Sequence, residues 1–494
     1  MTQADELAKV SAKIEAILPR QRDLYYDGQW QKPKGGYLDT FNPATGESLG
    51  PCAEANAADV DAAAKAAHKG FQVWRRMKPV ERAGLMKKVA AALRANADEL
   101  ALLDAANCGN PIKEMKNDAV VAAMMIEFCA GLVTEVKGET IPMGEGVLNM
   151  TVREPYGVVG RIVAYNHPIM FTAGKMGAAL ATGNTVIMKP PYQAPLSSYR
   201  MMELIEGIMP PGVINIISAG REGSEALVAH PLVPRISLIG SVPTGRAIAK
   251  SAAERLKHVT LELGGKNACI IYPDADLEKA ARAAVDGMNF TWCGQSCGST
   301  SRLFVHESVH DKVMAAVLER VKFYQPGIPT EMETTMGSIV SKVQFDKIMG
   351  YIDIARKEGA SLACGGKRPD DARLAKGFFI EPTIFTGVTQ KMRIANEEVF
   401  GPVLAVLKWK DEEAMFEQVN SVEYGLTGSI WTSSLATAHR AAGRVESGYI
   451  WVNNSSAHFI GASFGGYKQS GIGREEGSDE LLSFTQVKNI NITL

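Results

Sequence analysis

Short β-branched segments alternate with helical segments through the middle of the chain, and this alternation constrains the fold more than any other feature. The strand-like segments are residues 158–164, 185–188, 213–217 and 236–239, and the helical segments are residues 170–182, 195–208, 222–230 and 243–256. Such an alternation predicts a doubly wound parallel sheet, whose ligand cleft lies beyond the carboxyl ends of its strands. We therefore expect an α/β protein with a Rossmann-like domain.

The chain is long enough for two or three domains, because it has 494 residues. A second β/α series begins near Asn267 and continues past residue 450. Residues 133–155 are strand-like but interrupt the alternation, so we expect a projecting hairpin with which the last dozen residues could pair. We place the first domain at residues 1–132 and 156–264, the second α/β domain at 265–470, and a small β arm at 133–155 and 471–494.

Composition excludes several classes of function. The formal net charge is -1, which argues against a general surface for nucleic acid or for anionic membranes. The seven cysteines show no disulfide framework, and no CxxC pair or histidine cluster has zinc spacing, so we expect no metal. The N-terminus lacks a signal-type apolar core, and no run of 18 apolar residues occurs. We therefore expect a soluble protein of the reducing cytoplasm.

Cys297 lies in the segment Phe290–Arg302, which reads FTWCGQSCGSTSR. Small residues such as Gly294 and Gly298 surround it, so the backbone can approach a ligand closely. A cysteine is more often an inert apolar side chain than a nucleophile. The setting nevertheless makes Cys297 a candidate nucleophile at the bottom of a cleft.

Two polar residues stand at predicted strand ends. Asn166 follows the strand that ends IVAY, and its amide could hold a developing oxyanion or cap the next helix. Glu262, in VTLELGGKN, is either a carboxylate base or a solvated side chain. A thiol, an oxyanion donor and a base together would form an acyl-transfer site.

A turn from strand to helix offers a candidate phosphate site. Gly240, Ser241 and Gly245 lie where backbone N–H groups and a helix N-terminus would face a pyrophosphate, although an ordinary turn has the same spacing. The segment is not a P-loop, because Arg246 and Ala247 stand where lysine and serine or threonine are needed.

Nine short motifs follow one another along the chain. They are YNHP at Asn166, GNTVIMKP ending at Lys189, PPGVINII, LIGSVPTGR, LELGGKN at Glu262, GQSC at Cys297, EEVFGPV at 397–403, YGLTGSIWT from Tyr424, and FGGYKQSGIGRE from Phe464. Through these motifs the chain resembles the aldehyde dehydrogenase superfamily over essentially its whole length.

The resemblance implies a role for each of the polar candidates. Cys297 would be the nucleophile, Glu262 the general base, and Asn166 an oxyanion donor together with the backbone N–H of Cys297. Lys175 would lie near the proton path. The first domain would bind the cofactor, the second would be catalytic, and the β arm would join subunits into a homodimer or homotetramer.

The resemblance also implies a nicotinamide cofactor. Lys189 would reach the adenosine ribose, Gly240, Ser241 and Gly245 the pyrophosphate, and Glu398 with Phe400 the nicotinamide ribose and ring. Tyr192 stands where NAD-preferring members commonly have a glutamate that binds the ribose hydroxyls. A neutral side chain would not repel a 2′-phosphate, so we expect NAD or NADP to serve.

The expected substrate pocket departs from the family pattern at several positions. Trp292 stands where asparagine is frequent, His167 stands where an aromatic residue is frequent, and Gly174 replaces a bulky residue. The expected lining residues are Tyr165, His167, Met170, Phe171, Gly174, Trp292, His458 and Phe459. Met170 and Phe171 could equally be core residues of their helix. The pocket favours a medium or bulky aldehyde, aromatic ones included.

The implied reaction is the oxidation of an aldehyde to the carboxylic acid, through a thiohemiacetal and a thioester on Cys297. A CoA-acylating dehydrogenase is the first alternative, which the presence of Glu262 disfavours. A non-catalytic binding protein on the same fold is the second, but such a protein would be expected to lose Cys297 or Glu262.

Overall fold

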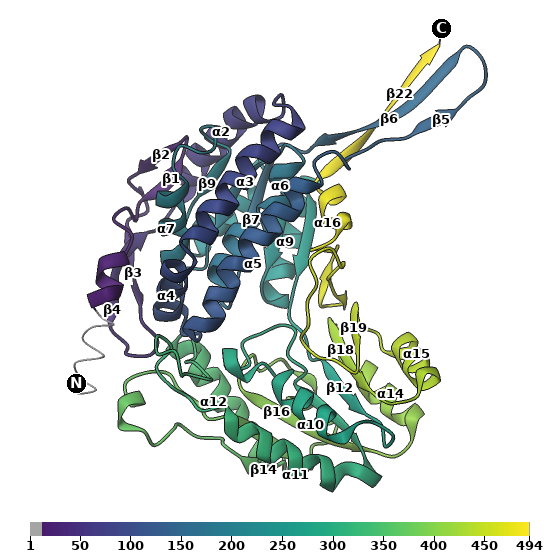
Figure 1. Ribbon diagram of the computed structural model, residues 1–494. Coiled ribbons are helices and arrows are strands. Elements are labelled where there is room, and N and C mark those ends of the chain that lie inside the picture. Colours follow the sequence, from purple (N-terminus) through teal and green to yellow (C-terminus); the bar gives the residue numbers. More distant parts are fainter. Residues whose placement is uncertain (1–11, 494) are drawn as a thin grey trace.

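The computed structural model describes residues 12–493. Figure 1 shows an upper body that holds one large sheet, a lower body that holds a second, and a β arm that projects from the upper body. The expectation that the N-terminus lacks a signal-type apolar core concerns a segment that lies mostly outside the described residues. Within residues 12–493, no helix is long and apolar enough to cross a membrane.

The first sheet has eight strands in the order β2-β1-β9-β8-β7-β10-β11-β21. Its strands are β1 (Leu24–Tyr26), β2 (Gln29–Gln31), β7 (Val158–Ile162), β8 (Thr185–Lys189), β9 (Ile214–Ile216), β10 (Arg235–Ile239), β11 (His258–Glu262) and β21 (Gly471–Ile472). The five central strands are parallel, whereas β1, β2 and β21 pair antiparallel at the two edges. The predicted doubly wound parallel sheet is therefore confirmed.

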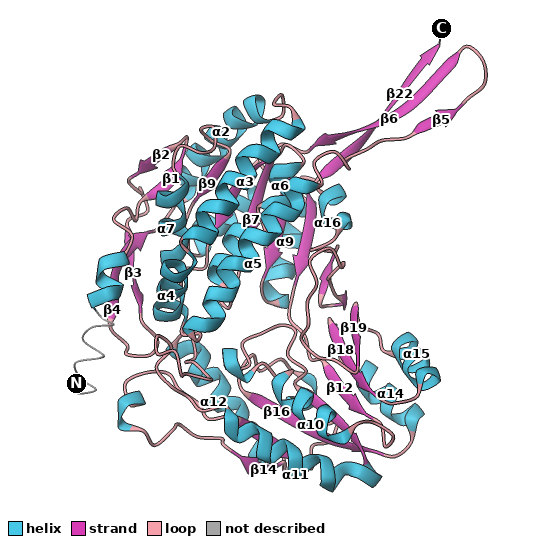
Figure 2. Cartoon of the chain, in the orientation of Figure 1, coloured by secondary structure: helices cyan, strands magenta, loops and turns pink. Residues whose placement is uncertain are grey.

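Helices enclose the first sheet (Figure 2). They are α2 (Ala57–Trp74), α3 (Pro79–Ala95), α4 (Ala97–Cys108), α5 (Ile112–Gly131), the π-helical turn η1 (Met170–Gly174), α6 (Gly177–Ala181), α7 (Leu196–Ile205), α8 (Arg221–Ala229) and α9 (Val242–Ala253). All residues of β7, β8, β9 and β10 are buried, because helices cover both faces of a doubly wound sheet. Helix α2 begins with a capping box, in which Asn56 and Asp59 satisfy each other's backbone N–H groups.

The second sheet has seven strands in the order β14-β15-β16-β13-β12-β18-β19. They are β12 (Ala268–Ile271), β13 (Arg302–His306), β14 (Ser361–Cys364), β15 (Thr383–Thr386), β16 (Val403–Trp409), β18 (Thr427–Trp431) and β19 (Tyr449–Val452). Its helices are α10 (Leu277–Asp286), α11 (His310–Arg320), α12 (Lys342–Lys357), α13 (Arg393–Asn396), α14 (Glu412–Asn420) and α15 (Leu435–Arg444). All pairs are parallel except β14 with β15, so the second α/β series is confirmed as well.

The arm consists of β5 (Thr140–Pro142), β6 (Val147–Pro155) and β22 (Thr485–Thr493). Strand β22 pairs antiparallel with β6 over its whole length, as the sequence predicted for the last residues. Helix α16 (Ser478–Ser483) precedes β22, and two small hairpin-like sheets join β3 (Tyr37–Phe41) to β4 (Ser48–Ala53) and β17 (Tyr424–Gly425) to β20 (Tyr467–Lys468). The residues of β21, which the sequence analysis assigned to the arm, pair with β11, and the domain limits as a whole stay a prediction.

Candidate active site

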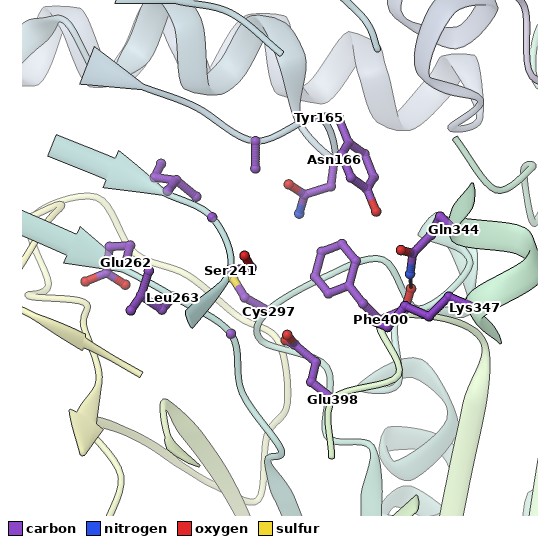
Figure 3. Close-up of a pocket in the computed structure, with 14 residues that line it drawn as sticks. Tyr165, Asn166, Ser241, Glu262, Leu263, Cys297, Gln344, Lys347, Glu398 and Phe400 are labelled. Atoms are coloured by element: carbon purple, nitrogen blue, oxygen red, sulfur yellow. Dashed lines mark hydrogen bonds between the residues drawn. The ribbon is translucent and has the colours of Figure 1, made fainter. Parts of the chain in front are cut away.

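A cavity of about 170 Å³ lies between the two bodies of the molecule. It is lined by Ala164, Tyr165, Asn166, Ile239, Gly240, Ser241, Glu262, Leu263, Gly264, Cys297, Gln344, Lys347, Glu398 and Phe400. These residues come from the carboxyl ends of β10 and β11, the loop after β7, and segments of the second body. In Figure 3, Asn166 lies on one side of the cavity and Glu262 on the other, with Cys297 between them. The structure thus brings the three predicted reactive residues together.

Asn166 presents its side chain to this cavity and is buried. Its backbone carbonyl accepts a hydrogen bond of 2.7 Å from Asn110 Nδ2, which fixes the turn. The next helical segment is capped by another residue, because the N–H of Ile169 donates to Asp104 Oδ2 at 3.0 Å. The amide of Asn166 is therefore left free for a ligand.

Cys297 lies on a tight loop after the 3-10 turn η2 (Phe290–Trp292). The carbonyl of Cys297 accepts a hydrogen bond of 2.7 Å from Asn267 Nδ2, and that of Ser299 accepts one of 3.0 Å from the same amide. Cys297 as a whole residue is partly exposed, whereas Cys293 is 1 % exposed. Burial raises the pKa of Cys297 to about 12, and the carboxyl groups of Glu262 and Glu398 add to the effect. The thiol therefore needs a base to become nucleophilic at neutral pH.

Glu262 is the last residue of β11 and is 5 % exposed. Neither oxygen of its carboxyl has a hydrogen-bond partner in the described residues. Burial raises the pKa of Glu262 well above its usual value; the negative charge of Glu475 adds to this, and Lys175 opposes it. These properties exclude a solvated side chain and suit a general base.

Behind Glu262 lies a group of buried charges that we call the ion-pair cluster. It comprises Arg161, Lys175, Glu475, Glu476 and Glu480. Lys175 Nζ lies 2.9 Å from Glu475 Oε2 and 3.2 Å from Glu476 Oε1. Arg161 bridges Glu475 to Glu480, with 3.1 Å to Glu480 Oε1. Lys175 does not line the cavity, but its positive charge opposes the rise in the pKa of Glu262.

The turn after β10 opens into the cavity at Gly240 and Ser241. Ser241 is the N-cap of α9, but its side chain forms no capping hydrogen bond, and its Oγ lies 3.0 Å from Thr244 Oγ1. Close packing explains the glycine at position 245, because a Cβ there would lie 2.7 Å from Leu263 Cδ1. The free N–H groups at the start of α9 suit an anion such as a pyrophosphate.

The opposite wall carries Glu398 and Phe400. Glu398 Oε1 accepts a hydrogen bond of 2.9 Å from the N–H of Gly265, and the ring of Phe400 packs edge-on against Tyr165 at 6.0 Å. Phe400 has a φ of 54°, and its carbonyl accepts a hydrogen bond of 2.8 Å from Gln344 Nε2. Sequence reasoning missed Gln344 and Lys347, whose only signal is their i, i+3 spacing on one face of α12.

Lys189 and Tyr192 lie at the end of β8, outside the lining of the cavity. Burial lowers the pKa of Lys189 to about 8, while the carboxylate of Glu54 opposes the effect. Lys189 Nζ lies 5.9 Å from the centre of the Tyr192 ring, which is 57 % exposed. The pair offers one cation and one neutral surface to a ligand at this strand end.

The predicted substrate-pocket residues form two groups. The ring of His167 contacts those of Phe171 and Trp292, with centroids 5.2 Å and 5.4 Å away. The ring of His458 contacts Phe464 at 4.9 Å. Tyr165 lines the cavity beside Phe400, and Phe459 is 61 % exposed.

Three positions of the expected pocket, Met170, Phe171 and Gly174, also serve packing. Met170 and Phe171 both pack into the core beneath η1. A Cβ on Gly174 would lie 2.8 Å from Met125 Sδ, so helix α5 occupies the space beside this glycine. A small residue is needed at position 174 for close packing. The lack of a side chain at Gly174 therefore does not by itself widen the substrate pocket.

Comparisons with known proteins agree with this geometry. The sequence model described as "Aldehyde dehydrogenase family" matches residues 30–490. Aldehyde dehydrogenase tropH of Talaromyces stipitatus is 50% identical over 489 residues, which cover 97% of this chain and 95% of that protein. Betaine aldehyde dehydrogenase of Mesorhizobium japonicum is 39% identical, with 95% of this chain and 96% of that protein covered.

Solved structures give the same result. The NAD+ complex of an aldehyde dehydrogenase from Bacillus cereus has a TM-score of 0.94 and 40% identity, and covers 98% of both chains. The Pseudomonas syringae indole-3-acetaldehyde dehydrogenase AldA, solved as a mutant with NAD+ and IAA, has a TM-score of 0.95 and 33% identity, and covers 99% of both chains.

Proposed function

We propose that this chain, which belongs to the aldehyde dehydrogenase family, passes its acyl group from Cys297 to water and releases a free carboxylic acid. Its NAD-dependent aldehyde dehydrogenase activity is shown by the family and by its full-length homologues. The observation that carries the proposal is the unpartnered, buried carboxyl of Glu262 in the same cavity as Cys297 and Asn166.

The residues around the cavity fit a dinucleotide. Gly240 and Ser241 would bind the pyrophosphate at the start of α9, Lys189 the adenosine ribose, and Glu398 with Phe400 the nicotinamide ribose and ring. NAD, when bound, supplies the acceptor for the hydride that leaves the substrate carbon.

Acylation begins at Cys297 Sγ. Its proton passes to a base, for which Glu262 is available, and the thiolate forms a bond to the aldehyde carbon. The carbonyl oxygen becomes an oxyanion that accepts hydrogen bonds from Asn166 Nδ2 and from the N–H of Cys297. Loss of hydride from the carbon restores the C=O bond and leaves a thioester on Sγ.

Deacylation requires Glu262 as a carboxylate, so a proton that it took from Cys297 must first pass to solvent. Glu262 then accepts a proton from water, the water oxygen bonds to the thioester carbon, and the C–S bond breaks to release the acid and the thiolate. The buried surroundings of Glu262 raise its pKa and so strengthen it as a base.

Tyr192 extends the proposal to the choice of cofactor. Because this side chain carries no negative charge, NADP is accepted as well as NAD. Lys189, whose Nζ lies 5.9 Å from the centre of the Tyr192 ring, is a cation that would favour an added phosphate.

The aromatic rings of Phe171 and Trp292 beside His167 support a medium or bulky aldehyde, aromatic ones included. The projecting strands β6 and β22 support a homodimer or homotetramer, because their exposed apolar side chains, among them Val487 and Leu148, are available to a second copy. All seven cysteines are free thiols, which supports a reducing cytoplasm.

Product analysis tests the hydrolytic step. The wild-type enzyme with aldehyde, NAD and excess CoA should release free acid, and CoA should not raise the steady rate. Release of acyl-CoA in preference to the acid would replace the hydrolytic reaction with the CoA-acylating one.

A further inference from the structure

His167 carries a polar contact that the reaction described above does not use. It follows Asn166 directly, and its Nδ1 lies 2.7 Å from Asp118 Oδ2 on α5. The side chain of His167 is 12% exposed and that of Asp118 is 8% exposed. Because a carboxylate only accepts hydrogen bonds, Nδ1 carries the proton and donates it. Nε2 then remains without a hydrogen-bond partner among residues 12–493.

The surroundings of His167 suit an aromatic molecule with a polar group. Phe171 and Trp292 flank its ring, at interplanar angles of 65° and 59°. The indole Nε1 of Trp292 is buried and also has no partner within the described part of the chain. A buried donor without a partner indicates a missing ligand or water.

The charges nearby restrict the kind of polar group. Asp104 is fully buried on α4, lies close to His167 and Asp118, and accepts a hydrogen bond from the N–H of Ile169. The carboxylate of Asp118 beside the imidazole disfavours an anionic substrate group. Burial raises the pKa of Asp104 to about 7, so this carboxyl adds less negative charge. A hydroxyl can donate to Nε2 of His167 and accept from Nε1 of Trp292, so it matches both groups.

We propose that His167, oriented by Asp118, determines specificity by binding a hydroxyl group on the ring of an aromatic aldehyde that packs against Phe171 and Trp292. The inference rests on the proposed function, because it requires the substrate to reach Cys297 past these side chains. Asp118 is a positioning residue, since it acts through His167.

Matched aldehydes test the inference directly. We would measure kcat/KM with NAD for benzaldehyde, 3-hydroxybenzaldehyde and 4-hydroxybenzaldehyde, and take the ratio of the better hydroxylated aldehyde to benzaldehyde. The wild-type ratio should be about tenfold or more, since a site built to bind a hydroxyl discriminates against an analogue that lacks it. In His167→Phe the ratio should fall towards one. Asp118→Asn should lower the ratio by a smaller factor.

A matched control removes general effects of replacing histidine by phenylalanine. His68→Phe, on the exposed face of α2, should leave the ratio unchanged. A ratio that stays at the wild-type value in His167→Phe would overturn the inference alone, and so would turnover of hexanal but of none of the aromatic aldehydes. Preference for 4-carboxybenzaldehyde that disappears in His167→Phe would replace the hydroxyl with a carboxylate. Failure to oxidise any of these aldehydes would contradict the proposed function instead.

Discussion

The reaction cavity and the ion-pair cluster are neighbours, but they differ in whether their buried charged groups have partners. In the cavity, both oxygens of Glu262 are buried without a hydrogen-bond partner among residues 12–493. In the cluster, Lys175 binds Glu475 and Glu476, and Arg161 binds Glu475 and Glu480. Buried charges are normally paired, so the unpaired carboxyl marks the group that acts on a ligand and the paired ones mark its support.

The pKa shifts follow the same division. Burial raises the pKa of Glu262, with Glu475 as the second cause. Burial would also raise the pKa of Glu476, but Lys175 and His458 outweigh it and lower that pKa to about 2. Glu262 therefore holds a proton more tightly than an ordinary carboxyl, whereas the lowered pKa values of Glu475 and Glu476 keep those two carboxyls charged.

The largest effect is expected at Cys297. Cys297→Ala removes the atom that bonds to the substrate, so aldehyde oxidation should fall on the order of 10⁴-fold or more, with NAD binding retained. Steady-state kinetics and a calorimetric titration with NAD would measure the two properties. Cys293→Ala is the matched control, because Cys293 is buried and lies four residues away. Equal loss in two folded variants would contradict the assignment.

Breaking the cluster should mainly affect stability. Glu475→Gln leaves Lys175 and Arg161 as incompletely paired buried charges, so the free energy of unfolding should fall by about 3–5 kcal/mol. Urea denaturation would measure this. The control Glu423→Gln removes the exposed pair between Glu423 and Arg246, and should cost at most about 1 kcal/mol. Similar decreases in the free energy of unfolding in both variants would show that the buried cluster contributes no more to stability than an exposed ion pair.

A smaller effect is expected from a change at Tyr192, on the choice between NAD and NADP. Tyr192→Glu places a carboxylate beside Lys189 and should shift the ratio of kcat/KM values towards NAD over NADP by roughly 10- to 100-fold. Kinetics with both cofactors would measure the shift. An unchanged ratio would show that Tyr192 does not face the 2′ position of the ribose.

The smallest expected effect is on the pH profile. Because the carboxylate form of Glu262 activates water and its pKa is raised, the rate of deacylation should fall as the pH falls below that raised pKa, by up to about tenfold per pH unit. Glu262→Gln should lose this acidic limb of the profile. A profile that keeps the limb in the variant would assign it to another group.

Local pattern was sufficient to predict much of the fold and to indicate candidate reactive residues, whose roles came from the resemblance to the family. The strands β7 to β10 were found because short β-branched runs alternate with helical ones, and Glu262 was found because it stands at a strand end before two glycines. The pairing of β22 with β6 was also predicted. The strands β7 to β10 depend on residues close together in the sequence, whereas the pairing of β22 with β6 joins residues such as Asn149 and Asn489, which are 340 positions apart.

Contacts between individual side chains of distant segments could not be predicted in the same way. Arg161 and Glu475 are 314 residues apart, and only the closed fold brings them together. Gln344 and Lys347 belong to no motif, since α12 reaches the cavity only through the packing of the second body. Gly174 was interpreted as space for substrate, whereas Met125 lies where its side chain would be. The volume of a substrate pocket depends on neighbouring side chains, whose positions cannot be read from the sequence.

A single-turnover experiment on Glu262→Gln tests the central claim, that Cys297 is acylated and Glu262 activates the water that releases the acid. The variant keeps the size of the side chain but lacks the base, so deacylation should slow by roughly 10²–10⁴-fold. Mixing it with NAD and aldehyde should give a burst of NADH of about one per active subunit, followed by slow turnover, with an acyl adduct on Cys297 by mass spectrometry. Steady turnover at the wild-type rate, without a burst or an adduct, would contradict the account.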